Sequence, residues 1–207
     1  MAAMSSRQQS EFVAAVVRHL PCDRISSDEA QRLIGQPTEI AALLERAFLA
    51  QESAPPPRPF IERRFALTFD YSVAPADALR ATGCDYIYPW MKLHCPPWKG
   101  TGIVEVEACL IDMGQDYETA EAEAAIAELG VEKAPDNLAI WTLSCVHPDL
   151  QREVGVMDPG CVWRGKRGCP CIACLGGHQD FRSAGLSHVA YGWSRRYRVL
   201  ALSKKRS

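Results

Sequence analysis

The chain has 207 residues, 47% of them apolar and 23% charged, with a formal net charge of −2. These values are typical of a soluble globular protein with one domain plus an appendage, or with two small domains. The longest uncharged apolar windows, residues 12–17 and 138–146, are far shorter than the roughly 20 residues that cross a bilayer, which argues against a transmembrane helix. No targeting signal is visible, so we expect a cytoplasmic location.

Charge is distributed unevenly along the chain. Residues 1–100 carry 11 basic and 11 acidic residues, residues 101–150 carry 1 and 11, and residues 151–207 carry 11 and 3. A basic segment of this kind can mark a nucleic-acid or other anionic partner. We favour a second interpretation, in which the acidic middle and the basic end attract one another within one fold, because the basic residues alternate with apolar ones.

Residues 1–50 are predicted to form a small N-terminal helical segment. Apolar residues recur with a helical period in residues 7–20, Ser26 and Glu29 have the spacing of a capping box, and Pro37 suits the first turn of another helix. Residues 51–59 are rich in proline and predict a stiff linker. We therefore expect a separate domain in residues 60–207.

Two strands and a short helix are predicted in the first half of that domain. Alternation predicts strands at 65–69 and 102–112, the second with Glu105 and Glu107 on a face toward water. Residues 74–82 predict a short helix that stops at Gly83. The aromatic and proline-rich residues 86–98 are expected to form an ordered loop packed on the core.

Two helices and several short strands are predicted after residue 112. We expect an alanine- and glutamate-rich helix at 117–129 and a second helix, capped by Asp136 or Asn137, that reaches residue 146. Short apolar runs separated by turn residues follow at 154–156, 161–163, 169–175, 189–193 and 197–202. Strands, two helices and then several strands indicate a mixed α+β domain after the helical segment.

The order of these elements resembles that of an uncharacterised bacterial protein family. The matching phrases are Ile25-Ser-Ser-Asp-Glu-Ala30, His147-Pro-Asp-Leu-Gln151, Gly160-Cys-Val-Trp163, Pro170 and Tyr197-Arg-Val-Leu-Ala201. No activity is attached to that family, so this resemblance supports a fold and not a function.

More distantly, the C-terminal region is similar to the C-type-lectin-like fold of the sulfatase-modifying-factor proteins, in which two helices precede irregular short strands. This resemblance implies an α+β domain of C-type-lectin-like character. Formylglycine-generating enzymes of that superfamily bind copper(I) through two cysteines spaced Cys-x4-Cys before the last strand, and Cys169 and Cys174 have this spacing. The resemblance therefore implies a copper-dependent oxidase as one hypothesis.

Soft metal ligands crowd in residues 161–178. Cys171 and Cys174 have the Cys-x2-Cys spacing of a zinc turn, and Cys169 with His178, or Cys161, would complete a tetrahedron. Alternation along a strand would instead place Cys169 and Cys171 on one face and Cys174 on the other. Zinc, copper and a buried strand without any cofactor remain alternatives, and we favour the buried strand.

Nine cysteines without a signal peptide are expected to be reduced. Five are scattered and are expected to be small buried apolar residues: Cys22, Cys84, Cys95, Cys109 and Cys145. A redox pair of Cys171 and Cys174 is a further alternative. So is a cysteine nucleophile paired with His94, His147, His178 or His188.

Our first functional hypothesis is a non-catalytic protein that binds a ligand or a protein partner. Loops at one end of the mixed sheet, including residues 86–98, would carry the binding site. The alternatives are a zinc-binding protein and the copper-dependent oxidase. Aromatic residues interleave with arginines near the C-terminus as on a single-stranded nucleic-acid platform, but their spread over several strands favours a core rimmed by surface arginines.

Overall fold

The computed structural model describes residues 57–204, in which one mixed sheet of seven strands is accompanied by five helices. The predicted helical segment 1–50 and most of the predicted linker 51–59 lie outside the described residues. The strands are β1 (Phe60–Asp70), β2 (Tyr86–Ile87), β3 (Ile103–Asp112), β4 (Gly155–Arg164), β5 (Pro170–His178), β6 (Phe181–His188) and β7 (Tyr197–Leu202). The helices are α4 (Pro75–Ala81), α5 (Pro89–Leu93), α6 (Thr119–Glu128), α7 (Leu138–Val146) and α8 (Leu150–Glu153).

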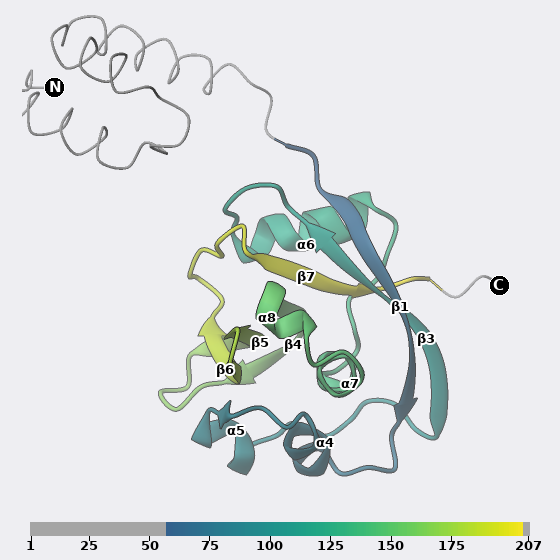
Figure 1. Cartoon of the computed structure of the whole chain (residues 1–207), viewed down its shortest axis with the longest axis vertical. Helices are drawn as coiled ribbons and strands as arrows, with labels where there is room; N and C mark the ends of the chain where they lie inside the picture. The colour runs from purple at the N-terminus through teal and green to yellow at the C-terminus, as the bar shows by residue number, and fades with distance from the viewer. Residues whose placement is uncertain (1–56, 205–207) are drawn as a thin grey trace, which may run out of the picture. The chain divides into compact units, whose positions relative to one another are not determined.

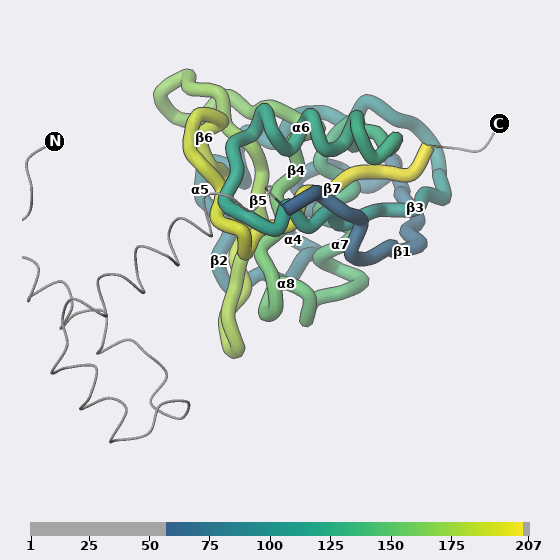
Figure 2. The backbone as a smooth tube through the Cα atoms, turned by 90° about the horizontal axis from the view of Figure 1, so that it is seen from above, coloured from purple at the N-terminus to yellow at the C-terminus, as the bar shows by residue number. Residues whose placement is uncertain are grey.

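Hydrogen bonds join the strands in the order β1-β3-β7-β4-β5-β6-β2. β4 pairs with β7 and β2 pairs with β6 in parallel, whereas the other neighbours are antiparallel. Helix α6 lies on one side of the sheet, and α4, α7 and α8 lie on the other (Figure 1 and Figure 2). The predicted α+β class is confirmed.

Each face of the sheet has its own group of buried side chains. Leu79 of α4 and Trp141 of α7 belong to the group on one face, and Ala122 and Ile126 of α6 belong to the group on the other. Central strands therefore bury both of their faces, which is typical of a sheet covered by helices on both sides. No described helix is both long and apolar enough to cross a membrane.

Several predicted elements are confirmed. The strands at 65–69 and 102–112 lie within or nearly coincide with β1 and β3, and the helices at 74–82, 117–129 and up to 146 correspond to α4, α6 and α7. Glu105 and Glu107 are exposed as expected, but only the first half of β3 alternates, because Cys109 and Ile111 are buried under α6.

Other predictions were wrong. Strand β6 was not predicted, because its sequence has polar residues and glycine where a strand pattern needs apolar ones; its pairing with β5 imposes the extended conformation. Residues 189–193, predicted as a strand, make only an isolated bridge between Tyr117 and Trp193. The expected loop 86–98 contains β2 and α5. Cys145, expected to be buried, is exposed, whereas Cys109 is buried as predicted.

Candidate functional site

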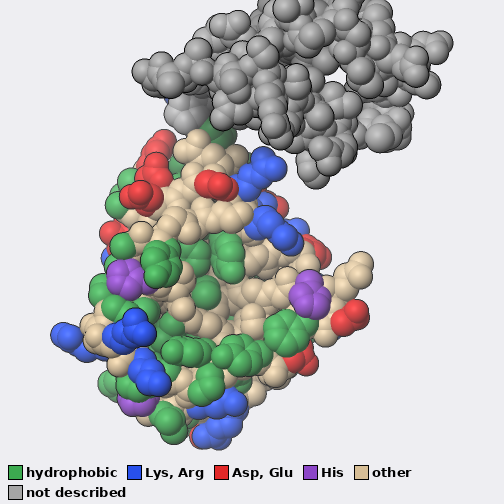
Figure 3. Space-filling view, turned by 90° about the vertical axis from the view of Figure 1, so that its left-hand side faces the viewer, with side chains coloured by type: hydrophobic (Ala, Val, Ile, Leu, Met, Phe, Trp, Pro, Cys, Tyr) green, Lys and Arg blue, Asp and Glu red, His purple; other side chains and the backbone are tan. Residues whose placement is uncertain are grey.

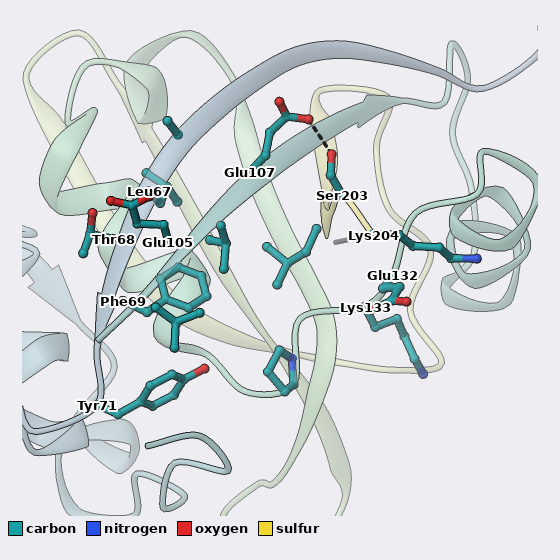
Figure 4. A pocket seen from close by; sticks show the side chains of 15 residues that line it. Leu67, Thr68, Phe69, Tyr71, Glu105, Glu107, Glu132, Lys133, Ser203 and Lys204 are labelled. Atoms are coloured by element: carbon teal, nitrogen blue, oxygen red, sulfur yellow. Dashed lines mark hydrogen bonds between the residues drawn. The ribbon is translucent and has the colours of Figure 1, made fainter. Parts of the chain in front are cut away.

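A broad groove of about 1010 Å³ lies beside the first half of β3. Residues of β1 and β3 form one side, and Glu132, Lys133 and Lys204 lie across from them (Figure 4). The complete lining is Ala66, Leu67, Thr68, Phe69, Tyr71, Val104, Glu105, Val106, Glu107, Glu132, Lys133, Pro135, Leu202, Ser203 and Lys204.

The groove exists because β7 is shorter than β3. β7 pairs with residues 108–111 of β3, and the last backbone contact between the two segments runs from the Ser203 N–H to the Glu107 carbonyl, at 2.8 Å. Between Ile103 and Val106, β3 is paired only with β1 within residues 57–204. In an antiparallel ladder alternate residues bond to opposite neighbours, so the backbone N–H and C=O of Glu105 face the groove as the Glu107 carbonyl does.

The two faces of the sheet give the groove two chemical characters. Leu67 is cross-strand partner to Val106, and Phe69 to Val104, so this face is apolar. Glu105 lies on the opposite face beside Glu107. Glu107 accepts a hydrogen bond from Arg64 and another from the Ser203 hydroxyl, the second of which is drawn in Figure 4.

Two carboxylates of the groove have no cationic partner within the described residues, and both are exposed. They are Glu105 on β3 and Glu132 across the groove. Lys133, by contrast, forms an ion pair with Glu123 at 2.9 Å. The groove thus offers negative charge to a ligand that supplies a cation.

Among the described strands, the outer edge of β1 is the other long edge, and it differs from the groove. It carries Arg63 and Arg64, and its pairing with β3 shifts register between Ile61 and Arg63. Charged side chains and bulges are the usual features that protect an edge strand from pairing. The open part of β3 lacks a bulge, and Glu105 is its only charged residue.

A buried polar network holds the groove wall opposite β3. Asp136 accepts hydrogen bonds from the backbone N–H groups of Lys99 (3.0 Å) and Leu138 (3.1 Å). The side-chain amide of Asn137 donates to Asp158 at 3.0 Å, and its oxygen accepts from the Trp163 indole N–H at 2.5 Å. The side chains of Asp136 and Asn137 are thus both anchored in the core. Because they follow Pro135 in the chain, these bonds fix the segment that presents Pro135 to the groove.

Asp158 is fully buried in this network. Its pKa is raised to about 7, mainly by burial and also by the Asp136 carboxylate, while hydrogen bonds from the Gly160 N–H and from Asn137 oppose the rise. Between pH 3.8 and about 7 the unfolded chain therefore releases this proton whereas the folded chain retains it. We expect the contribution of Asp158 to the free energy of unfolding to fall as the pH rises through this window and to level off above it.

The variant Asp158→Asn isolates this effect, because its side chain at position 158 has no carboxyl group to titrate. Urea unfolding at a series of pH values should show the stability of the variant, relative to the wild type, rising by on the order of 3 kcal/mol from pH 4 to pH 7. Asp149→Asn, which removes an exposed carboxylate, is the control. A relative stability of Asp158→Asn that stays constant with pH would contradict the prediction.

The predicted metal ligands of residues 161–178 are divided between the two faces of β5. Cys171 belongs to the buried group on the α7 side and Cys169 packs against it, whereas Cys174 packs against the group under α6. His178 is exposed at the end of β5 and stacks on Phe181. In residues 57–204 no three His, Cys, Asp or Glu side chains are grouped closely enough to hold a metal ion.

The structure does bring Cys169 and Cys171 together. Their Sγ atoms are 3.8 Å apart beside the β4–β5 turn. Burial and the contact with Cys169 raise the pKa of Cys171, so this thiol is protonated at neutral pH. Burial raises the pKa of Cys174 to about 12. The zinc and copper sets proposed from sequence both include Cys174 and stay predictions.

The four described histidines each contact an aromatic ring. The ring of His94 stacks on Trp90 with centroids 3.6 Å apart, and that of His147 lies 4.6 Å from Phe65. His188 accepts a hydrogen bond from the Ala190 N–H and lies beside Tyr191. No hydrogen bond joins a histidine to a cysteine in the part of the chain that the structure describes. The hypothesis of a cysteine nucleophile activated by a histidine therefore stays a prediction.

Basic residues near the C-terminus are partly used inside the fold. Arg198 forms ion pairs with Glu62 and Asp112, and Arg182 donates to the carbonyl oxygens of Thr82 and Gly83. On the face at the left of Figure 1, Lys and Arg side chains form separate groups between hydrophobic side chains (Figure 3). Of these contacts, only the ion pair between Arg198 and Asp112 joins the basic end to the acidic middle. Attraction between the two segments and a nucleic-acid partner both stay predictions.

Sequence reasoning missed the groove. Glu105 was identified only as a residue facing water, and nothing in the local pattern of β3 shows that β7 ends early. The unequal lengths of two predicted strands, 102–112 and 197–202, were the available signal.

A scan against protein-family models found no match, and searches of curated proteins and of solved structures found none either.

Proposed function

We propose that this protein is a non-catalytic binding protein that captures an extended segment of a partner protein in the groove beside β3. The observation that carries this proposal is the backbone edge at Ile103–Val106, which has no pairing partner beyond β1 among residues 57–204 because β7 has ended. A partner strand would pair with this edge and continue β7, which is the mode of recognition called β-strand addition.

The shape of the groove favours an extended chain over a compact small molecule. Its volume of about 1010 Å³ is at the upper end of small-molecule sites, which span about 300–1000 Å³, and it is an open channel along a strand. Main-chain hydrogen bonds to Glu105 would supply affinity without dependence on the sequence of the partner.

The side chains around the edge define the partner. A strand paired with β3 directs alternate side chains to opposite faces. Those on the Val104 and Val106 face would meet apolar surface. Those on the Glu105 face would meet a carboxylate that has no cationic partner within residues 57–204. The partner segment should therefore alternate apolar with basic residues.

The first test is fluorescence anisotropy with a labelled peptide of four Val-Lys repeats. We expect binding that weakens with added salt, because ion pairs at an exposed site are screened. A peptide of four Val-Glu repeats and a Val-Lys peptide with N-methylated backbone amides should not bind. Equal binding of all three peptides would contradict strand addition.

The variant Glu105→Lys should weaken Val-Lys binding about tenfold or more, since it replaces attraction by repulsion at the proposed cation site. Asp180→Lys makes the same charge change in the exposed turn between β5 and β6, which are separated from β3 by other strands of the sheet, and is the matched control. Equal losses in the two variants would show that net charge, and not the groove, determines binding.

The binding site proposed here differs from the loop 86–98 that the sequence indicated. A C-type-lectin-like ancestry would agree with a binding role, but the groove does not depend on it. The zinc-binding and copper-oxidase hypotheses stand as alternatives that require cysteines among residues 169–174, and metal analysis of the purified protein separates them from a binding role without metal.

A further inference from the structure

The turn between β4 and β5 carries three cations that form no ion pair with the described carboxylates. All three are exposed: Arg164, Lys166 and Arg167. The Gly165 N–H donates to the Cys169 carbonyl at 2.8 Å, and the Gly168 N–H donates to the Gly165 carbonyl at 2.8 Å. These bonds hold the turn as the regular end of a hairpin, so the three cations are presented to solvent on a fixed loop.

An exposed stack of two rings lies against the β4 strand of this hairpin. The indole N–H of Trp90 donates to the Arg164 carbonyl at 2.9 Å. The ring of His94 lies on that of Trp90, with centroids 3.6 Å apart and an interplanar angle of 11°. Because His94 is exposed, the face of its ring that turns away from Trp90 is open to solvent. A further planar ring can continue this stack.

A second aromatic pair lies against the β5 strand. The Val189 N–H donates to the Pro170 carbonyl at 3.1 Å, which holds the segment after β6 beside the first residue of β5. In that segment the ring of Tyr191 lies 5.4 Å from that of His188, and Tyr191 is 66% exposed. Because Pro170 is the cross-strand partner of Arg164, the basic turn lies between the two aromatic pairs.

The two aromatic pairs and the turn at 164–168 together are called the basic corner below. The segments that form it contain no acidic residue: 86–104, 159–179 and 181–207. On the face drawn in Figure 3, Lys and Arg side chains lie close to histidine and hydrophobic side chains. A polyanion that approaches the basic corner therefore meets cations and rings, and no carboxylate from these segments.

We propose that the basic corner binds single-stranded nucleic acid, with bases stacked on His94 and Tyr191 and with phosphates against the cations of the turn. Exposed aromatic rings and neighbouring cations are the two features that such sites combine, since any base offers a face for stacking. A duplex keeps its bases stacked on one another, so it would offer only phosphates. The site goes beyond strand addition and lies apart from the groove, because β7 and β4 separate β3 from β5 in the sheet.

The first test is fluorescence anisotropy of the full-length protein with labelled oligo(dT) of about twelve nucleotides and with an abasic strand of the same length. The abasic strand keeps the phosphates and lacks the bases, so we expect it to bind about tenfold more weakly or worse. If each of the three cations contacts one phosphate, oligo(dT) affinity should fall about fifteenfold between about 50 and 200 mM salt. Equal affinity for the two strands overturns the proposal.

The variants His94→Ala and Tyr191→Ala test the stacking rings. Each should weaken oligo(dT) binding about fivefold or more while changing the affinity for the abasic strand little, because only the bases lose a partner. Phe60→Ala is the matched control: Phe60 is 52% exposed and lies on β1, at the opposite end of the sheet from β6 and β2. The proposal is overturned if the loss in both ring variants is no larger than in the control.

The double variant Lys166→Glu/Arg167→Glu tests the cations. It should weaken both strands about tenfold or more and make oligo(dT) binding less sensitive to salt, because fewer phosphates are neutralised. Arg58→Glu/Lys204→Glu makes the same change of net charge at two exposed residues outside the basic corner and is the control.

Equal losses in the two double variants would show that net charge alone drives binding, which overturns the proposal. Oligo(U) is measured in parallel, and tighter binding of either strand supports the proposal while naming RNA or DNA as the partner. Binding to phosphatidylserine vesicles without binding to either strand would assign the basic corner to a membrane surface and also overturn it.

Discussion

Replacing Gly160 by alanine is expected to abolish stable folding or to lower the free energy of unfolding by more than about 3 kcal/mol. A Cβ atom at this position would lie 1.9 Å from the carbonyl oxygen of Ala134, which is a backbone atom held next to the buried network. Neither strand β4 nor the 134–137 segment can move aside without breaking the hydrogen bonds of Asp158 and Asn137. Urea unfolding followed by circular dichroism measures the loss.

Gly176→Ala is the matched control for this prediction. Gly176 also lies in a central strand, but its added Cβ would be 3.5 Å from the Tyr197 hydroxyl, an ordinary contact. We expect this variant to change stability by less than about 1 kcal/mol. Similar unfolding midpoints for Gly160→Ala and Gly176→Ala would show that the close approach to Ala134 does not constrain the fold.

The variant Asn137→Ala is expected to lower the free energy of unfolding by about 3–5 kcal/mol. It removes the donor to Asp158 and the acceptor of the Trp163 indole N–H, and both of these groups are buried. A buried polar group that loses its partner costs about 1–3 kcal/mol, so two such groups account for most of the effect. Chemical unfolding at pH 7 tests this directly.

The same variant should also affect the groove. Asn137 holds the segment that carries Pro135, so its loss should increase amide hydrogen exchange in residues 132–137 and weaken peptide binding. Lys133→Ala, which removes an exposed ion pair in the same segment, should cost less than about 1 kcal/mol. If Asn137→Ala is no more destabilising than Lys133→Ala, the network does not support this wall.

The sequence by itself determined the α+β class and the elements β1, β3, β7, α4, α6 and α7, because hydrophobic periodicity records which face of an element is buried. It also determined that Cys169 and Cys171 share a face that Cys174 does not, since side chains alternate along any strand. The sequence did not predict β6, because the extended conformation of this segment depends on its pairing with β5 and not on a pattern of apolar residues of its own. Nor did it predict the exposure of Cys145, because helix α7 is apolar nearly all round, so periodicity does not identify its exposed side.

Only the tertiary structure decided where β7 stops beside β3, and therefore where a backbone edge and a groove remain open. It alone brought Asn137 to Asp158 and Trp163, which are 21 and 26 residues away along the chain. It also placed Gly165 over the sulfur atoms of Cys169 and Cys171. Each of these features is a contact between segments distant in sequence or across a turn, and local patterns carry no information about which segments meet.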